Sequence, residues 1–191
     1  MTPPRMNSVI TYLEMTQRPT SPTPTRPAMP IALMRAQDMP VSFYRYLYNA
    51  VGEDWLWYER RLVDDETLAA TIQNPDVFVY VLYVKGSPAG YGELDLRFGK
   101  DRVELEYFGL LPEFIGLKLG RYFLRWLVDE AWTHEPERVT VNTCDLDHPR
   151  ALGVYQSTGF MPYQRETKEF DDPRVHNWFP DWVDRRPGAS Q

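Results

Sequence analysis

The chain has 191 residues, of which 43% are apolar and six are tryptophan. This length allows one domain with a sizeable core, and the composition is that of a folded protein rather than a disordered one. The formal charge of −6 argues against a general binder of nucleic-acid phosphates, so we expect no nucleic-acid partner.

Cysteine and histidine usage excludes two further classes of protein. The single cysteine, Cys144, cannot form an intramolecular disulfide and provides no cluster for structural zinc. The three histidines show no metal-ligand spacing, so we expect no metal. The sequence shows no signal peptide and no run of ~20 apolar residues, which predicts a cytoplasmic protein with no membrane partner.

The first 36 residues predict two strands separated by an extended connector. Residues 7–16 alternate as a strand does, and residues 31–35 form a short apolar run typical of an edge strand. Five prolines lie in residues 18–30, a density that excludes regular hydrogen-bonded structure. We interpret this segment as a connector within one domain of residues 1–170, not as a domain boundary.

Residues 41–59 are crowded with aromatic side chains and predict a helix that begins at Ser42 and ends at Gly52. A second helix is expected over residues 65–73, capped by the aspartate that precedes or begins it. Two interpretations of the rings remain: they pack in the core, or they form a wall of a substrate pocket.

Three consecutive antiparallel strands are expected next. Residues 77–84 are an apolar, β-branched run, residues 85–88 have turn chemistry, and residues 89–98 return as the partner strand. A further strand covers residues 103–111. Strands followed by alternating helices and strands predict a mixed α/β fold.

A glycine-containing turn joins this last strand to a helix over residues 119–131. The first turn of a helix has unpaired N–H donors and the positive end of the dipole, so such a turn can hold an anion. Downstream we expect a strand at residues 138–144, a helix at residues 148–157 and a strand at residues 160–170. Residues 171–191 contain three aromatic rings, and we expect part of this tail to dock on the domain.

Two motifs together resemble the GNAT superfamily of acyl-CoA-dependent N-acyltransferases over roughly residues 76–170. The second motif commonly reads Asn-x-x-Ala-x-x-Leu-Tyr-x-x-x-Gly-Phe, with His148 here at the Asn position. The sequence matches it at four positions: Ala151, Tyr155, Gly159 and Phe160. The family's pyrophosphate loop, Arg/Gln-x-x-Gly-x-Gly/Ala, falls on residues 115–120.

The pyrophosphate loop departs from the family pattern at two positions. Gly120 matches, whereas Ile115 replaces the polar residue and Lys118 replaces a glycine. Lys118 either adds a charge toward the pyrophosphate or is a solvated lysine on the helix surface.

The resemblance implies a central, mostly antiparallel sheet flanked by helices, in which one parallel strand pair splays apart to admit acetyl-CoA as co-substrate. The pair would be residues 103–111 and 139–144, and Gly109 suits a bulge that opens the edge. The implied cofactor contacts are Gly109, Leu110, Leu111, Gly116, Leu117, Lys118, Leu119, Gly120, Arg121, Asn142 and His148.

The resemblance also implies residues for acyl transfer to an amine. The family takes its base from the central strand or from a water chain ending in a carboxylate, and Glu106 and Glu104 are the candidates. We prefer Glu106, which lies nearer the splay point. Tyr155 matches the family's general acid toward sulfur, and a backbone N–H near Leu110 would stabilise the oxyanion. The side chains of Glu106 and Tyr155 also have purely structural interpretations, as a strand carboxylate and as a helix aromatic packed on the core.

The predicted function is transfer of an acetyl group from acetyl-CoA to a primary amine of a small molecule or peptide, by direct attack in a ternary complex. Two alternatives remain: a non-catalytic acyl-CoA-binding regulatory module, or a partner-binding protein that uses its aromatic surface. A homodimer is compatible with the sequence. The candidate acceptor contacts are Tyr44, Trp55, Glu93, Asp95 and Glu104.

Overall fold

Seven strands form one mixed sheet in the computed structural model, which describes residues 4–180 and residue 183. The strand order is β2-β3-β4-β5-β6-β1-β7, and all neighbours are antiparallel except the parallel pair β5–β6. This confirms the predicted mixed α/β fold. The strands are β1 (Arg5–Met15), β2 (Ile31–Ala36), β3 (Val77–Val84), β4 (Ser87–Asp95), β5 (Arg102–Leu110), β6 (Arg138–Cys144) and β7 (Met161–Asp171).

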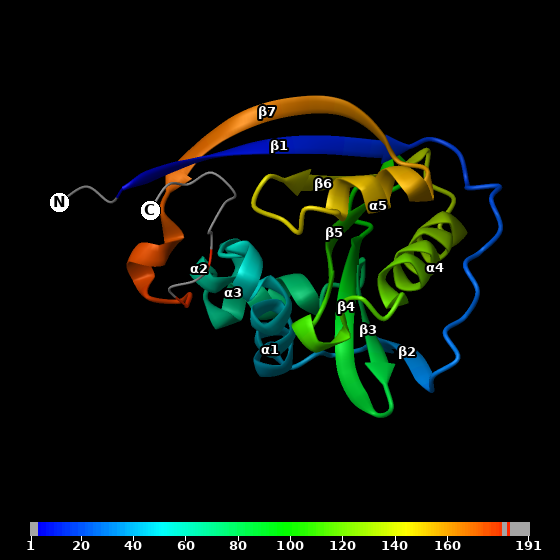
Figure 1. The fold of residues 1–191 in the computed structure, drawn as a ribbon, viewed down its shortest axis with the longest axis horizontal. Helices are drawn as coiled ribbons and strands as arrows, with labels where there is room; N and C mark the ends of the chain where they lie inside the picture. Colours follow the sequence, from blue (N-terminus) through cyan, green and yellow to red (C-terminus); the bar gives the residue numbers. More distant parts are fainter. Residues whose placement is uncertain (1–3, 181–182, 184–191) are drawn as a thin grey trace.

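Helices cover both faces of the sheet (Figure 1). Helices α4 and α5 lie on one side, and α1, α2 and α3 lie on the other. The helices are α1 (Val41–Gly52), α2 (Glu59–Leu62), α3 (Asp65–Ile72), α4 (Leu119–Thr133) and α5 (Ala151–Thr158). Short 3-10 turns are η1 (Glu53–Trp55), η2 (Pro112–Phe114) and η3 (Pro173–His176).

Alternate side chains of β3 pack against helices on opposite faces of the sheet. Tyr80 and Leu82 pack with the apolar stripe of α4, whereas Val79 and Val81 pack with α1 and α3. A strand covered on both sides reads as a continuous apolar run, as β3 does in the sequence. The two cores together hold the central strands in place beneath the site described below.

The parallel pair β5–β6 separates partway along its length, as the resemblance implied. Cα pairing runs from Arg102 opposite Arg138 to Leu105 opposite Val141 and then ends, although both strands continue. Beyond this point β6 stays paired with β1, and β5 stays paired with β4. The two halves of the sheet therefore diverge at Glu106.

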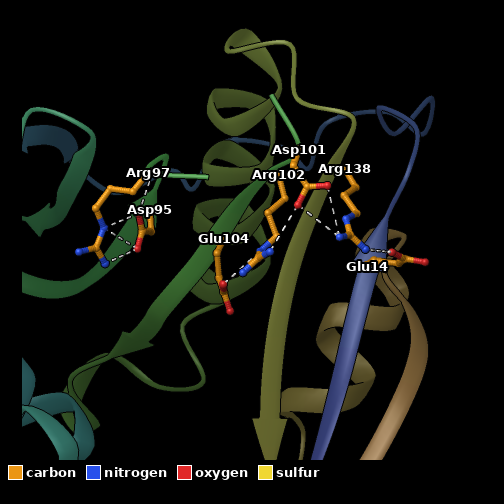
Figure 2. A network of polar contacts seen from close by, with 7 residues as sticks. All are labelled: Glu14, Asp95, Arg97, Asp101, Arg102, Glu104 and Arg138. Atoms are coloured by element: carbon orange, nitrogen blue, oxygen red, sulfur yellow. Dashed lines mark hydrogen bonds and ion pairs between the residues drawn. The ribbon is translucent and has the colours of Figure 1, made fainter. Parts of the chain in front are cut away.

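Ion pairs fasten the paired end of β5 and β6 (Figure 2). Asp101 accepts hydrogen bonds from Arg102 and Arg138, Arg138 also contacts Glu14 of β1 at 3.2 Å, and Arg102 contacts Glu104 at 3.5 Å. These groups are partly exposed, so each pair contributes little alone. Their position ties β5, β6 and β1 together at the end away from the splay.

A β-bulge lies at Glu106 and not at Gly109, so that prediction was wrong. Glu93 of β4 is opposite Tyr107, whereas its neighbour Leu94 is opposite Leu105, and Glu106 is the extra residue. Gly109 is paired in register with Tyr91. A Cβ on Gly109 would lie 2.3 Å from Val51 Cγ1, so glycine there admits helix α1 against β5.

The ends of helices α1, α3 and α5 agree only in part with the predictions from the sequence. Asp64 caps α3 by accepting a hydrogen bond from the Thr67 N–H at 2.8 Å, as expected. Ser42 does not cap α1, because the N-cap is Pro40 and no side chain caps this end. Helix α5 begins at Ala151 rather than at His148, and Gly159 ends it with a φ of +117°.

The segment after β7 contacts helix α2. Arg61 donates a hydrogen bond from Nη1 to the Trp178 carbonyl at 2.9 Å and lies over the Phe179 ring. Trp182, the third ring of the tail, lies outside the described residues. Within the described part of the chain, the longest helix has 15 residues, and no helix combines the length and apolar character of a membrane span.

Candidate functional site

A cavity of about 1210 Å³ opens where β5 and β6 separate. Its central wall is β5 from Glu106 to Leu110, opposite the end of β6 and the start of α5. One end is formed by the turn before α4, and the other end by α2 together with β7. The ribbon of β1 and β7 extends past the end of β6 toward the side on which α2 lies (Figure 1).

The turn before α4 offers the features of an anion site. Gly116 and Lys118 both have positive φ, at +88° and +61°. Lys118 is the N-cap residue of α4 and makes no side-chain cap, so the first-turn amides keep their hydrogen-bonding capacity. Three cationic side chains line this end of the cavity: Lys118, Arg121 and Arg150. Donors, helix dipole and cations together fit a pyrophosphate.

Most of the predicted cofactor contacts lie together on this cavity: Gly109, Leu110, Gly116, Lys118, Gly120, Arg121, Asn142 and His148. Leu111 does not, because it is buried and its N–H already donates to the Ala89 carbonyl at 2.9 Å. The Leu119 side chain is fully buried in the core, and the Leu117 side chain points to solvent. Their backbone still belongs to the turn.

Glu106 occupies the bulge at the splay point, and its side chain lines the cavity. Burial raises the pKa of Glu106 to about 7, and the nearby carboxylates Glu104 and Glu93 add to the rise. A carboxyl group with this pKa exchanges its proton near neutral pH, which suits a general base.

Tyr155 lines the cavity from α5. Its ring packs on Phe108 and Phe160, and it is 7% exposed. Burial, with the charge of Asp147 as a smaller cause, raises the pKa of the Tyr155 hydroxyl well above its ordinary value. The hydroxyl therefore stays protonated at neutral pH and is able to donate a proton or a hydrogen bond.

Only Trp55 among the five predicted acceptor contacts lines the cavity. The other four serve the framework. Tyr44 donates to Glu93 at 2.6 Å, and Glu93, only 1% exposed, also forms an ion pair with Arg60 at 2.7 Å. Asp95 is held by Arg97, and Glu104 by Arg102. Because these carboxylates already have partners, they are not available to an acceptor amine.

The cavity residues that the sequence reasoning missed include Asp147, Glu59 and Arg60. Asp147 accepts hydrogen bonds from Thr143 Oγ1, the Cys144 N–H and Trp57 Nε1. It therefore holds the loop of residues 56–58, called the aromatic loop below, against the end of β6. Glu59 and Arg60 enter from the four-residue helix α2. A helix of four residues leaves no periodic signal, so the sequence offered no means of placing them.

Comparisons with known proteins agree with this geometry. Residues 43–160 match the acetyltransferase (GNAT) family. A search of curated proteins gives no match.

Solved structures show the same fold at low identity. A tandem GNAT protein from the clavulanic acid biosynthesis pathway is 17% identical, with a TM-score of 0.61, over 85% of this chain and 53% of that one. A GCN5-related N-acetyltransferase from Sphaerobacter thermophilus has the same identity and TM-score over 86% and 52%. The chain thus spans about half the length of these two proteins.

An aminoglycoside acetyltransferase from an uncultured soil metagenomic sample is 14% identical, with a TM-score of 0.55, over 68% of this chain and 87% of that one. These likenesses establish the fold, and the match over residues 43–160 establishes the family. The chain belongs to the GNAT acetyltransferase family.

Proposed function

We propose that the protein transfers an acetyl group from acetyl-CoA to a primary amine of a small molecule, by direct attack of the amine while both substrates are bound. The observation that carries the proposal is Glu106. Its pKa of about 7 lies at the operating pH of a general base, and the bulge presents it to the cavity at the splay point.

In the proposed reaction the chain supplies three groups. The Glu106 carboxylate accepts the proton of the attacking amine. The N–H of Leu110, on the wall beyond Glu106, stabilises negative charge that develops on the carbonyl oxygen. The Tyr155 hydroxyl donates a proton to the departing sulfur. Acetyl-CoA supplies the activated acyl group, and the residues of the turn before α4 bind its phosphates.

The two ends of the cavity assign the substrates to opposite sides. Cations and free helix amides gather at the turn before α4, which favours the polyanionic cofactor. Aromatic rings gather at α2 and β7, where Arg60 and Lys168 are paired with Glu93 and Glu166, and the carboxylate of Glu59 favours an amine. The aminoglycoside acetyltransferase of the same fold acts on an amine-bearing small molecule, which supports this class of acceptor.

The test is release of free coenzyme A thiol from acetyl-CoA in the presence of a panel of primary amines. Amine-dependent release above the buffer rate is expected. Tyr155→Phe should lower turnover about 10²-fold while cofactor affinity, measured by calorimetry, stays within about twofold. If the cofactor binds but no amine gives release, the protein is an acyl-CoA-binding module instead, and equal turnover of Tyr155→Phe removes that hydroxyl from the mechanism.

A further inference from the structure

One carboxylate of the cavity has no part in the proposed chemistry. Glu59 is the first residue of α2, and its side chain opens into the cavity at the end away from the pyrophosphate turn. It accepts a hydrogen bond from the Tyr107 hydroxyl at 3.2 Å. Across the part of the chain that the structure describes, no Lys, Arg or His forms an ion pair with it.

The other charged groups near Glu59 are already compensated. Arg60 pairs with Glu93 at 2.7 Å, and Lys168 pairs with Glu166 at 3.2 Å. Among the other acidic groups that line the cavity, Asp147 accepts three hydrogen bonds and Glu169 contacts Arg5. The cavity-lining cations that form no ion pair with any described residue, Lys118, Arg121 and Arg150, lie at the opposite end.

Within the described part of the chain, Glu59 is thus an exposed carboxylate on the wall of the cavity that has no ion-pair partner. Desolvation raises the pKa of Glu59, and the Tyr107 hydrogen bond together with the charges of Arg60 and Lys168 partly offsets the rise. An ammonium group that binds beside Glu59 would supply the charged hydrogen-bond partner that the chain itself does not provide there.

The walls around Glu59 suit an organic cation. Tyr58 stacks on Phe170 of β7 with ring centroids 5.3 Å apart, which closes this end of the cavity between α2 and β7. The rings of Trp57 and Tyr107 lie 5.2 Å apart on the β5 side. Aromatic faces attract ammonium groups, and they shield such a group from water when it also meets a carboxylate.

We propose that Glu59 binds a second ammonium group of the acceptor, so that the natural substrate is a diamine or a larger polyamine. This rests on the proposed function, in which the reacting amine faces Glu106. Tyr107 follows Glu106 in β5 and reaches Glu59 with its hydroxyl. The two carboxylates therefore mark two amine positions along one aromatic wall.

The test compares 1,4-diaminobutane with butylamine, which has the same carbon chain and one amine. Binding of each amine is measured by calorimetry with coenzyme A present, and turnover is measured by thiol release. In the wild-type protein the diamine should bind at least about tenfold more tightly than the monoamine, because a hydrogen bond to a charged group adds this much affinity. Glu59→Gln should abolish that difference in affinity.

The control is Glu66→Gln, which makes the same charge change on the exposed surface of α3. It should retain the full preference for the diamine. If Glu59→Gln binds both amines as the wild type does, or loses affinity for both by the same factor, the preference for the diamine is kept and Glu59 does not bind a second ammonium group. The calorimetric result stands by itself, so absence of turnover with every amine would refute the proposed acetyl transfer without deciding this inference.

Discussion

At the scale of single residues, the site depends on which carboxylates are left without a partner. Glu93, Asp95 and Glu104 each form an ion pair with an arginine. Glu106, in contrast, lies at the bulge near other carboxylates. The paired carboxylates still act on the site, because the charges of Glu104 and Glu93 help to raise the pKa of Glu106. Two residues that the sequence suggested for the acceptor, Glu93 and Glu104, therefore raise the pKa of Glu106 instead.

Replacement of this base should have a characteristic effect on the pH dependence of the reaction. Below about pH 7 the Glu106 carboxyl is protonated and cannot accept the amine proton, so kcat/KM should fall as the pH falls through that value. Glu106→Gln should lower kcat by about 10²–10⁴-fold and remove the inflection near pH 7. The dependence of kcat/KM on pH is measured by thiol release between pH 5.5 and 8.5 for both proteins. A variant that keeps the wild-type inflection would assign it to another group.

At the scale of elements, sequence reasoning predicted what local chemistry controls and missed what packing controls. The β3–β4 hairpin followed from its turn residues, and Asp64 followed from the preference of aspartate for helix starts. The bulge at Glu106 could not be predicted from the sequence. Regular alternation along β5 places Tyr107 and Leu105 on the same face of the sheet. The extra residue turns Tyr107 toward Tyr48 and Trp57 on the α1 side, and Phe108 toward Phe123 on the α4 side.

The turn before α4 allows a test that separates backbone strain from charge. Lys118 adopts a left-handed conformation that costs a non-glycine residue about 1–2 kcal/mol. Lys118→Gly should therefore be more stable than Lys118→Ala by about 1 kcal/mol in urea unfolding. Both variants lose the ammonium group that lines the cavity, so both should bind coenzyme A more weakly, and to a similar extent.

Two results would contradict this account of the turn. Equal stabilities of Lys118→Gly and Lys118→Ala would mean that the left-handed conformation is not strained. Wild-type affinity for coenzyme A in both variants would show that the lysine is a solvated surface residue with no role in binding.

At the scale of the whole molecule, two sequence motifs were enough to predict the fold, and most of the residues that they suggested for the cofactor lie on one cavity. Both motifs lie on local strand–turn–helix segments that meet where β5 and β6 separate. The end of the cavity proposed for the acceptor could not be predicted in the same way. It is assembled from α2, β7 and the aromatic loop, which are distant in sequence and meet through contacts such as Tyr58 on Phe170 and Trp57 on Asp147.

The most direct test of the central claim is a crystal structure of the protein with coenzyme A bound. We expect the pyrophosphate on the backbone amides of residues 116–121, and the pantetheine arm in the gap between β5 and β6. The sulfur should lie beside Glu106 and the Tyr155 hydroxyl. Coenzyme A bound outside this cavity, or bound with its sulfur away from both side chains, would contradict the account.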